Sequence, residues 1–275
     1  MRRAIILLLL ALGASSLASC GKGGSQALVV RTVTTSKQAT PNSGSGGGTG
    51  TAPSTPTSPP SSSSPSHAHA LAFAQAVNLT ADDVPGFKAS EKENHSSARE
   101  KRLEQDMVKC AGTTALGEAG SSSHNALAAE SSKQYELKHG ILDFSVSSEV
   151  SVQSSAAEAL SALKAIRSSH VRGCFSHYLQ QVFKGEQLKG AKVGPVSIQA
   201  GVPPAPGTSG GFGWRVTASF IVRTIKVPIY LDFLGFVDGP AEVTLLSTGL
   251  IRPFPAEVQQ RLFALLLTRA KQHAL

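Results

Sequence analysis

Leu142–Val152 reads LDFSVSSEVSV, and its pattern is the clearest indication of the fold in this sequence. Apolar side chains occupy every second position except Ser148, and Asp, Ser or Glu occupies each position between them. A period of two residues places the two sets of side chains on opposite faces of an extended chain. Eleven residues of this pattern therefore predict a long β-strand with one buried face.

Further strands are predicted C-terminal to this one, and short turns connect some of them. Asp238-Gly239 stands between two apolar runs, a combination typical of a tight β-hairpin. The predicted strands are Lys192–Gln199, Trp214–Val222, Ile229–Val237 and Ala241–Ser247. With Leu142–Val152 they form an antiparallel sheet of about five strands.

Helical segments flank the strands. Leu103, Met107 and Cys110 stand at i, i+4 and i+7, on one face of a helix that ends at Gly112. Three more helical segments follow Ser155, Ser169 and Pro255. Because strands and helices do not alternate regularly, we expect an α+β domain with its helices packed on one face of the antiparallel sheet.

The N-terminus has the pattern of an export signal. Arg2-Arg3 precedes the nine-residue apolar run Ala4–Leu12, which is too short to span a bilayer. Leu17-Ala18-Ser19-Cys20 follows. This segment resembles the lipobox of bacterial lipoprotein precursors, and an ordinary secretory signal that happens to precede a cysteine is the alternative.

The lipobox resemblance implies cleavage before Cys20, a diacylglyceryl thioether on its sulfur and an acyl group on its new amine. Two or three lipid chains anchor a protein stably, because each buried CH₂ contributes about 0.8 kcal/mol. We therefore expect residues 1–19 to be a signal peptide. Residues 20–66, rich in Gly, Ser, Thr and Pro, form a disordered tether, and residues 67–275 form the globular domain.

The charge of the chain gives little support to nucleic-acid binding. The whole sequence carries a net charge of +8. From residue 67 onward, however, 21 basic residues face 18 acidic ones, a net charge of only +3. No basic stripe is interleaved with aromatic residues, so no nucleic-acid partner is expected.

Of the three cysteines, two remain available once Cys20 is lipidated. Cys110 and Cys174 lie on apolar helix faces, and an exported protein can form disulfides. A disulfide between them is therefore expected. The alternative is a zinc site in which Cys110 and Cys174 join His170 and His177, which share one face of a helix with Cys174.

No combination of residues predicts catalysis. Gly207–Gly211 matches the pattern G-x-S-x-G, but a nucleophile elbow needs a strand before it and a helix after it. A Pro-rich loop precedes this segment and a predicted strand follows it. We expect no catalytic residue, no cofactor and no enzyme activity; a hydrolase that uses His170 or His177 is a third alternative.

A family resemblance adds to this interpretation. Two segments are similar to uncharacterised actinobacterial exported lipoproteins: NLTADDVPGF at Asn78–Phe87, and the C-terminal segment from Phe254 to Ala270. More loosely, residues 67–275 resemble the PknH-type extracellular sensor domains of mycobacterial kinases. That resemblance implies a helix-flanked antiparallel sheet in the cell envelope. The PknH-type domains have two disulfides, whereas this chain can form one, and no binding residue carries over.

These patterns favour a membrane-anchored, extracytoplasmic lipoprotein that binds a ligand or partner without catalysis. The alternative is a structural or assembly lipoprotein of the cell envelope. Expected partners are the membrane, through the lipid anchor, and an envelope protein, a lipid or a small ligand. Loops on a rigid sheet often carry binding residues, so Gly201–Gly213 is the expected contact surface.

Overall fold

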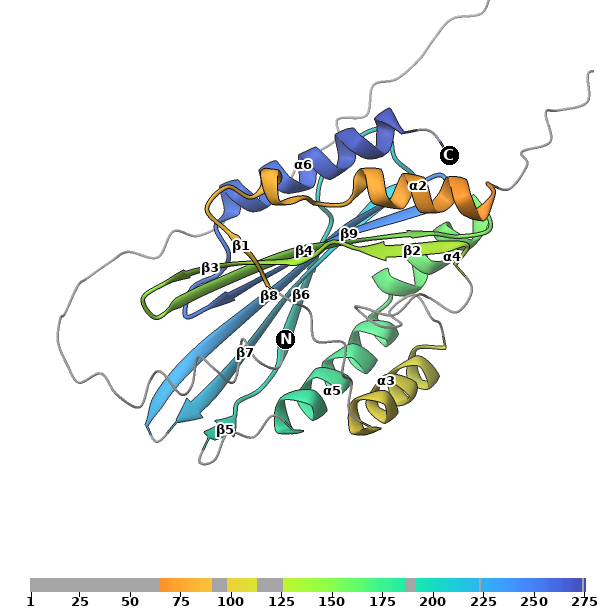
Figure 1. Cartoon of the computed structure of the whole chain (residues 1–275). Helices are drawn as coiled ribbons and strands as arrows, with labels where there is room; N and C mark the ends of the chain where they lie inside the picture. Colours follow the sequence, from red (N-terminus) through yellow and green to blue (C-terminus); the bar gives the residue numbers. More distant parts are fainter. Residues whose placement is uncertain (1–64, 91–97, 113–125, 186–190, 223, 274) are drawn as a thin grey trace, which may run out of the picture. The chain divides into compact units, whose positions relative to one another are not determined.

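A computed structural model describes residues 65–90, 98–112, 126–185, 191–222, 224–273 and 275. These residues belong to one compact unit (Figure 1). The predicted signal peptide, Cys20 and almost all of the predicted tether lie outside the described residues. None of the described helices combines the length and apolarity that crossing a membrane requires.

Helices and strands alternate irregularly along the chain, as expected for the α+β class. The helices are α2 (His67–Val77), the 3₁₀ helix η1 (Ala81–Asp83), α3 (Ala98–Ala111), α4 (Ala156–Arg167), α5 (Ser169–Gly185) and α6 (Ala256–Gln272). The strands are β1 (Lys88–Ser90), β2 (Ala128–Ser131), β3 (Gln134–His139), β4 (Leu142–Val152), β5 (Ala191–Val193), β6 (Ser197–Gly201), β7 (Gly210–Val222), β8 (Ile225–Asp238) and β9 (Ala241–Leu250).

All nine described strands join one sheet, whose order is β1-β3-β4-β9-β8-β7-β5. β2 also pairs with β4, β6 also pairs with β7, and every described pairing is antiparallel. The α+β class is confirmed, and β4 has the bounds that its alternation predicts. The prediction of about five strands was too low: β1, β2 and β3, of three to six residues each, were not predicted, and the predicted strand Lys192–Gln199 is divided into β5 and β6.

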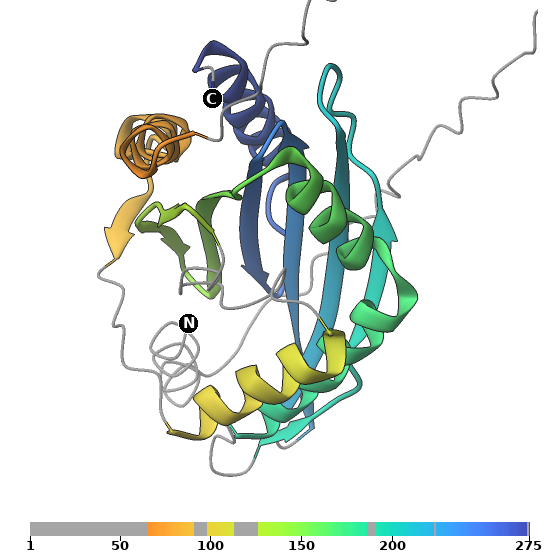
Figure 2. The ribbon, with the colours of Figure 1, turned by 90° about the vertical axis from the view of Figure 1, so that its right-hand side faces the viewer.

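Helices cover both faces of the sheet, so the prediction of one covered face was wrong. Figures 1 and 2 show α2 and α6 on one face and α3, α4 and α5 on the other. Across the sheet, Val146 of β4 pairs with Ser247, which pairs with Asp232, which pairs with Arg215 of β7. Paired residues share a face, so the apolar face of β4 lies on the same side as the polar face of β7.

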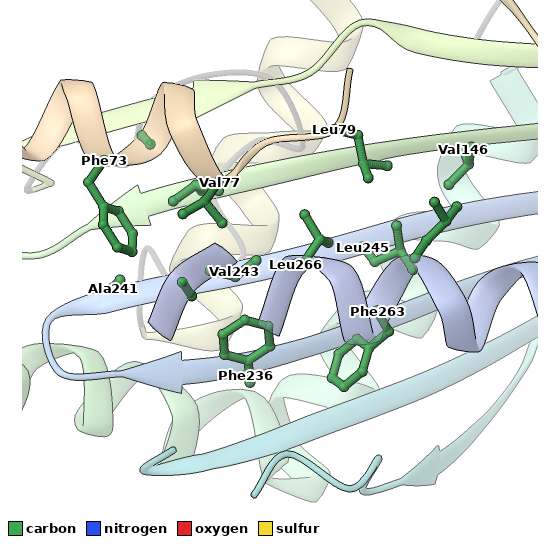
Figure 3. Packing of buried hydrophobic residues seen from close by; sticks show 14 of the residues in the cluster. Phe73, Val77, Leu79, Val146, Phe236, Ala241, Val243, Leu245, Phe263 and Leu266 are labelled. Carbon is green, nitrogen blue, oxygen red and sulfur yellow. The ribbon is translucent and has the colours of Figure 1, made fainter. Parts of the chain in front are cut away.

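Two apolar clusters fill the spaces between the sheet and its helices. The first joins α2 and α6 to β4, β8 and β9, and Figure 3 shows its side chains. Phe236 of β8 meets Phe263 of α6 edge-on, with ring centroids 5.6 Å apart. The second cluster joins α3, α4 and α5 to β7 and β8. Two separate clusters explain why strands with opposite apolar faces are stable in one sheet.

The helix α2 was not predicted from the sequence. Ala70, Phe73, Ala74 and Val77 follow the helical spacing i, i+3, i+4 and i+7, and all four are buried. Ser66 caps the helix, because its hydroxyl accepts a hydrogen bond from the backbone of His69. The helical spacing can therefore be recognised in the sequence, although the helix directly follows a Ser/Pro-rich segment.

Replacing Gly249 or Gly173 by alanine should change the free energy of unfolding in opposite directions. At Gly249, an added Cβ would lie 2.2 Å from the carbonyl oxygen of Arg252, so Gly249→Ala should destabilise the fold by about 1–3 kcal/mol. At Gly173, in α5, an added Cβ has no neighbour within 4 Å. Gly173→Ala should stabilise the fold by up to about 1 kcal/mol. Urea denaturation measures both, and equal effects would contradict the packing around Gly249.

Candidate functional site

An open hollow of about 480 Å³ lies where β6 ends and β7 begins. Its lining is mainly apolar and includes one cation: Arg167, Ala200, Gly201, Val202, Phe212 and Trp214. Gly201, Val202 and Phe212 belong to the expected contact surface Gly201–Gly213, and Trp214 follows it directly. The hollow therefore lies at the segment that the sequence singled out.

Strand pairing sets the wall of the hollow. Ala200 pairs with Trp214, and Gly201 pairs with Gly213, so the end of β6 lies alongside β7. Val202, the next residue, is 65% exposed although it is apolar. An exposed aliphatic side chain beside a buried indole gives the hollow an apolar rim.

Arg167 is held firmly at the edge of the hollow. It is the last residue of α4, and its Nε donates a hydrogen bond to the carbonyl oxygen of Gly211 at 2.9 Å. Its Nη2 donates to the same oxygen. The described structure gives Arg167 no carboxylate partner within salt-bridge distance, so its positive charge is available to an anionic group. Arg167 was not among the residues predicted from the sequence, because only the fold brings α4 to Gly211.

Aromatic side chains pack around Trp214, which lines the hollow. The Trp214 indole is 2% exposed, and its ring centroid lies 5.3 Å from that of Phe175 and 6.3 Å from that of Phe212. Phe175 also meets Phe233 edge-on at 5.3 Å. Such packing holds the indole in one orientation. The site can therefore present a fixed apolar wall and one guanidinium to a ligand.

Among the residues that the structure describes, the lining of the hollow contains one ionisable side chain, that of Arg167. No histidine, cysteine or carboxylate lines the described hollow. Ser209 of the G-x-S-x-G segment lies between β6 and β7, and its backbone N–H donates to the carbonyl oxygen of Val237. β7 begins within this segment, at Gly210, where a nucleophile elbow would require the start of a helix.

Cys110 and Cys174 form the expected disulfide. The bond joins α3 to α5, so neither sulfur is a free thiolate in this structure. His170 does lie beside the disulfide, with its Nε2 3.9 Å from Sγ of Cys174. Cys110, His170 and Cys174 form a group of possible metal ligands, and exposed His177 is not part of it.

A buried ionic network lies on the opposite face of the sheet and has a structural role. Asp232 is 3% exposed and receives hydrogen bonds from Arg215 at 2.6 and 2.8 Å. Gln259 of α6 donates to Asp232 at 3.1 Å and to the hydroxyl of Ser247 at 2.6 Å. Because Asp232 is paired and hydrogen-bonded, this network ties α6 to the sheet.

Asp83, part of the acidic pair Asp82-Asp83 in η1, is likewise structural. Arg269 of α6 contacts both of its carboxylate oxygens at 2.8 Å. The side chain and backbone N–H of Thr80 add hydrogen bonds to the same carboxylate. Despite its burial, these bonds hold the pKa of Asp83 below its usual value. The carboxylate therefore stays ionised and secures the chain after α2.

Glu242 should make stability depend on pH. Burial raises the pKa of Glu242 from 4.5 to about 7; Glu149 raises it further, and a hydrogen bond to Gln153 opposes the shift. Its buried Oε1 has no hydrogen-bond partner among the described residues. A raised carboxyl pKa favours the folded state while the group is protonated, so stability falls as pH rises from about 4.5 to about 7.

Glu242→Gln should therefore raise the free energy of unfolding above pH 7, by a gain on the order of 3 kcal/mol. The gain should vanish near pH 4.5, where both side chains are neutral in the folded protein. Urea denaturation from pH 4.5 to 8 measures the difference. A gain that is the same at every pH would contradict the titration of Glu242.

Comparisons with known proteins give one structural neighbour and no family. No family model matches the sequence, and no curated protein matches it. A solved structure of the extracellular domain of PknH from Mycobacterium tuberculosis is similar at a TM-score of 0.39 and 10% sequence identity. The similarity covers 73% of this chain and 96% of that chain. The extracellular domain of PknH is thus a structural neighbour, at low identity.

Proposed function

We propose that this chain is a lipid-anchored, extracytoplasmic protein that binds a small anionic amphiphile without catalysis. The observation that carries the ligand class is the hollow beside Trp214. An apolar wall suits a hydrocarbon or aromatic body, and the Arg167 guanidinium suits a carboxylate, sulfonate or phosphate. A ligand that combines both features fits the lining better than a purely polar or purely apolar one.

The location of the protein rests on the sequence. A positive start, a nine-residue apolar run and Leu17-Ala18-Ser19-Cys20 support a lipid anchor on Cys20. The 46 residues from Gly21 to Ser66 would span about 40 Å as a flexible coil. We infer that the globular domain is tethered at that range from the extracytoplasmic face of the cell membrane.

The ligand class can be tested with anilinonaphthalene sulfonate, which joins an aromatic body to one anionic group. Trp214 is the sole tryptophan of the chain, so energy transfer from it reports binding near the hollow. We expect one probe to bind per chain. Arg167→Gln should weaken the binding about 10-fold or more, because a hydrogen bond to a charged group contributes about 1.5–3 kcal/mol.

Arg261→Gln is the matched control, since Arg261 is an exposed arginine of α6 on the opposite face of the sheet. This variant should bind the probe like the wild type. Equal binding by Arg167→Gln and the wild type would contradict the assigned anion site. Absence of saturable binding would contradict ligand binding at the hollow and favour the structural or assembly alternative.

A further inference from the structure

The end of α3 meets the start of α5 at the group Cys110, His170 and Cys174. One nitrogen or sulfur atom from each residue lies within 4.8 Å of the others. Nε2 of His170 lies 2.7 Å from the backbone carbonyl oxygen of Cys110, to which it donates. This hydrogen bond holds the imidazole edge toward the two sulfur atoms.

We propose that reduction of the Cys110–Cys174 disulfide creates a zinc site formed by the two thiolates and the imidazole of His170. The proposal is independent of the ligand proposed for the hollow. It differs from the four-ligand site considered above, because His177 is outside the group. Three protein ligands leave the fourth position of a tetrahedral zinc ion to water.

The observed distances are close to those that zinc requires. With bonds of about 2.3 Å to sulfur and 2.0–2.1 Å to nitrogen, a tetrahedral ion holds sulfur and nitrogen about 3.6 Å apart. Sγ of Cys174 and Nε2 of His170 are already 3.9 Å apart. The two sulfurs must separate after the S–S bond breaks. Nε2 must leave the Cys110 carbonyl and lose its proton to solvent while Nδ1 takes up a proton, so that the neutral imidazole presents the Nε2 lone pair to the metal.

The position of Cys110, His170 and Cys174 permits both reduction of the disulfide and binding of the ion. Cys110 and His170 are exposed and Cys174 is buried, so a reductant and an ion can approach from the Cys110 side. A dithiol donates two electrons and two protons to the disulfide; two thiols form here, and the dithiol becomes a disulfide. Binding of Zn²⁺ then releases both thiol protons to solvent.

Thiolate and imidazole ligands select the metal class. Soft sulfur ligands and imidazole suit Zn²⁺, whereas Mg²⁺ and Ca²⁺ prefer oxygen ligands. Two thiolates also neutralise the charge of the divalent ion. We therefore assign Zn²⁺ as the ligand, which binds only the reduced protein.

The test uses the full chain with Cys20→Ser, so that Cys110 and Cys174 supply all the thiols. Zn²⁺ alone is titrated against a chromophoric chelator, with the protein either oxidised or reduced by a phosphine. We expect one ion per reduced chain and an affinity at least ~100-fold higher than in the oxidised chain. His170→Ala should weaken binding at least ~10-fold, whereas His177→Ala should change it less than about twofold.

A second measurement separates loss of the site from loss of folding. Bound zinc should slow alkylation of the two thiols in the wild type and in His177→Ala, but not in His170→Ala. Circular dichroism of the reduced wild type, His170→Ala and His177→Ala, recorded before zinc is added, should agree and so verify that the reduced chains keep their fold. Equal zinc affinity in the two redox states, unchanged affinity in His170→Ala, or an equal loss in His177→Ala would each overturn the proposal.

Discussion

Replacing Cys110 and Cys174 together by serine should lower the free energy of unfolding by about 4 kcal/mol. The disulfide joins residues 64 positions apart, and the loop that it closes is long enough to restrict the unfolded chain strongly. It also fastens α3, which packs against α5. Urea denaturation of the double variant and the oxidised wild type, at the same pH, measures the difference.

Two controls make this result specific. Reducing the wild type should reproduce the loss, because it breaks the same covalent bond. Cys20→Ser should leave the free energy of unfolding unchanged, since Cys20 is outside the disulfide. A loss below about 1 kcal/mol in the double variant would show that the disulfide does not restrict the unfolded chain as the 64-residue separation implies.

Cys20→Ser should release the protein from membranes and reduce its membrane-bound fraction at least ~100-fold. Serine cannot form the thioether to a diacylglyceryl group, and loss of the lipid chains removes about 0.8 kcal/mol for each buried CH₂. Separation of a bacterial lysate by ultracentrifugation, followed by immunoblotting of both fractions, measures the distribution. Intact mass of the membrane fraction should show the added lipid.

Cys174→Ser is the control for this experiment, because it removes a thiol while keeping the lipobox residues. It should remain in the membrane fraction. A Cys20→Ser protein that sediments with membranes as the wild type does would contradict the lipid anchor. The ligand proposed for the hollow and the zinc site would remain separately testable.

Local patterns predicted individual elements well. The alternation in Leu142–Val152 gave the bounds of β4, and Asp238-Gly239 marked the turn between β8 and β9. A break near Ser168 separates α4 from α5, as the sequence predicted. These features depend on neighbouring residues, whose spacing is visible along the chain.

The candidate site was only partly predictable. The segment Gly201–Gly213 was identified from its Gly/Pro content and its place before a strand, and it contributes to the hollow. Arg167 could not be assigned to the site, because it is 44 residues from its partner Gly211 in sequence. The proximity of His170 to Cys110 likewise depends on how α3 packs against α5.

The residue pattern alone was enough to identify most of the longer helices and strands, the apolar face of each long strand and the two cysteines that could pair, whereas α2, β1, β2 and β3 were not identified. That β4 and β7 turn their apolar faces to opposite sides of the sheet, so that helices cover both faces, became visible only in the folded molecule. Alternating apolar and polar residues show that a strand has one apolar face. The side of the sheet to which that face points is set by pairing with distant strands. Packing of α4 against β7 and β8 placed Arg167 at the hollow that Trp214 also lines.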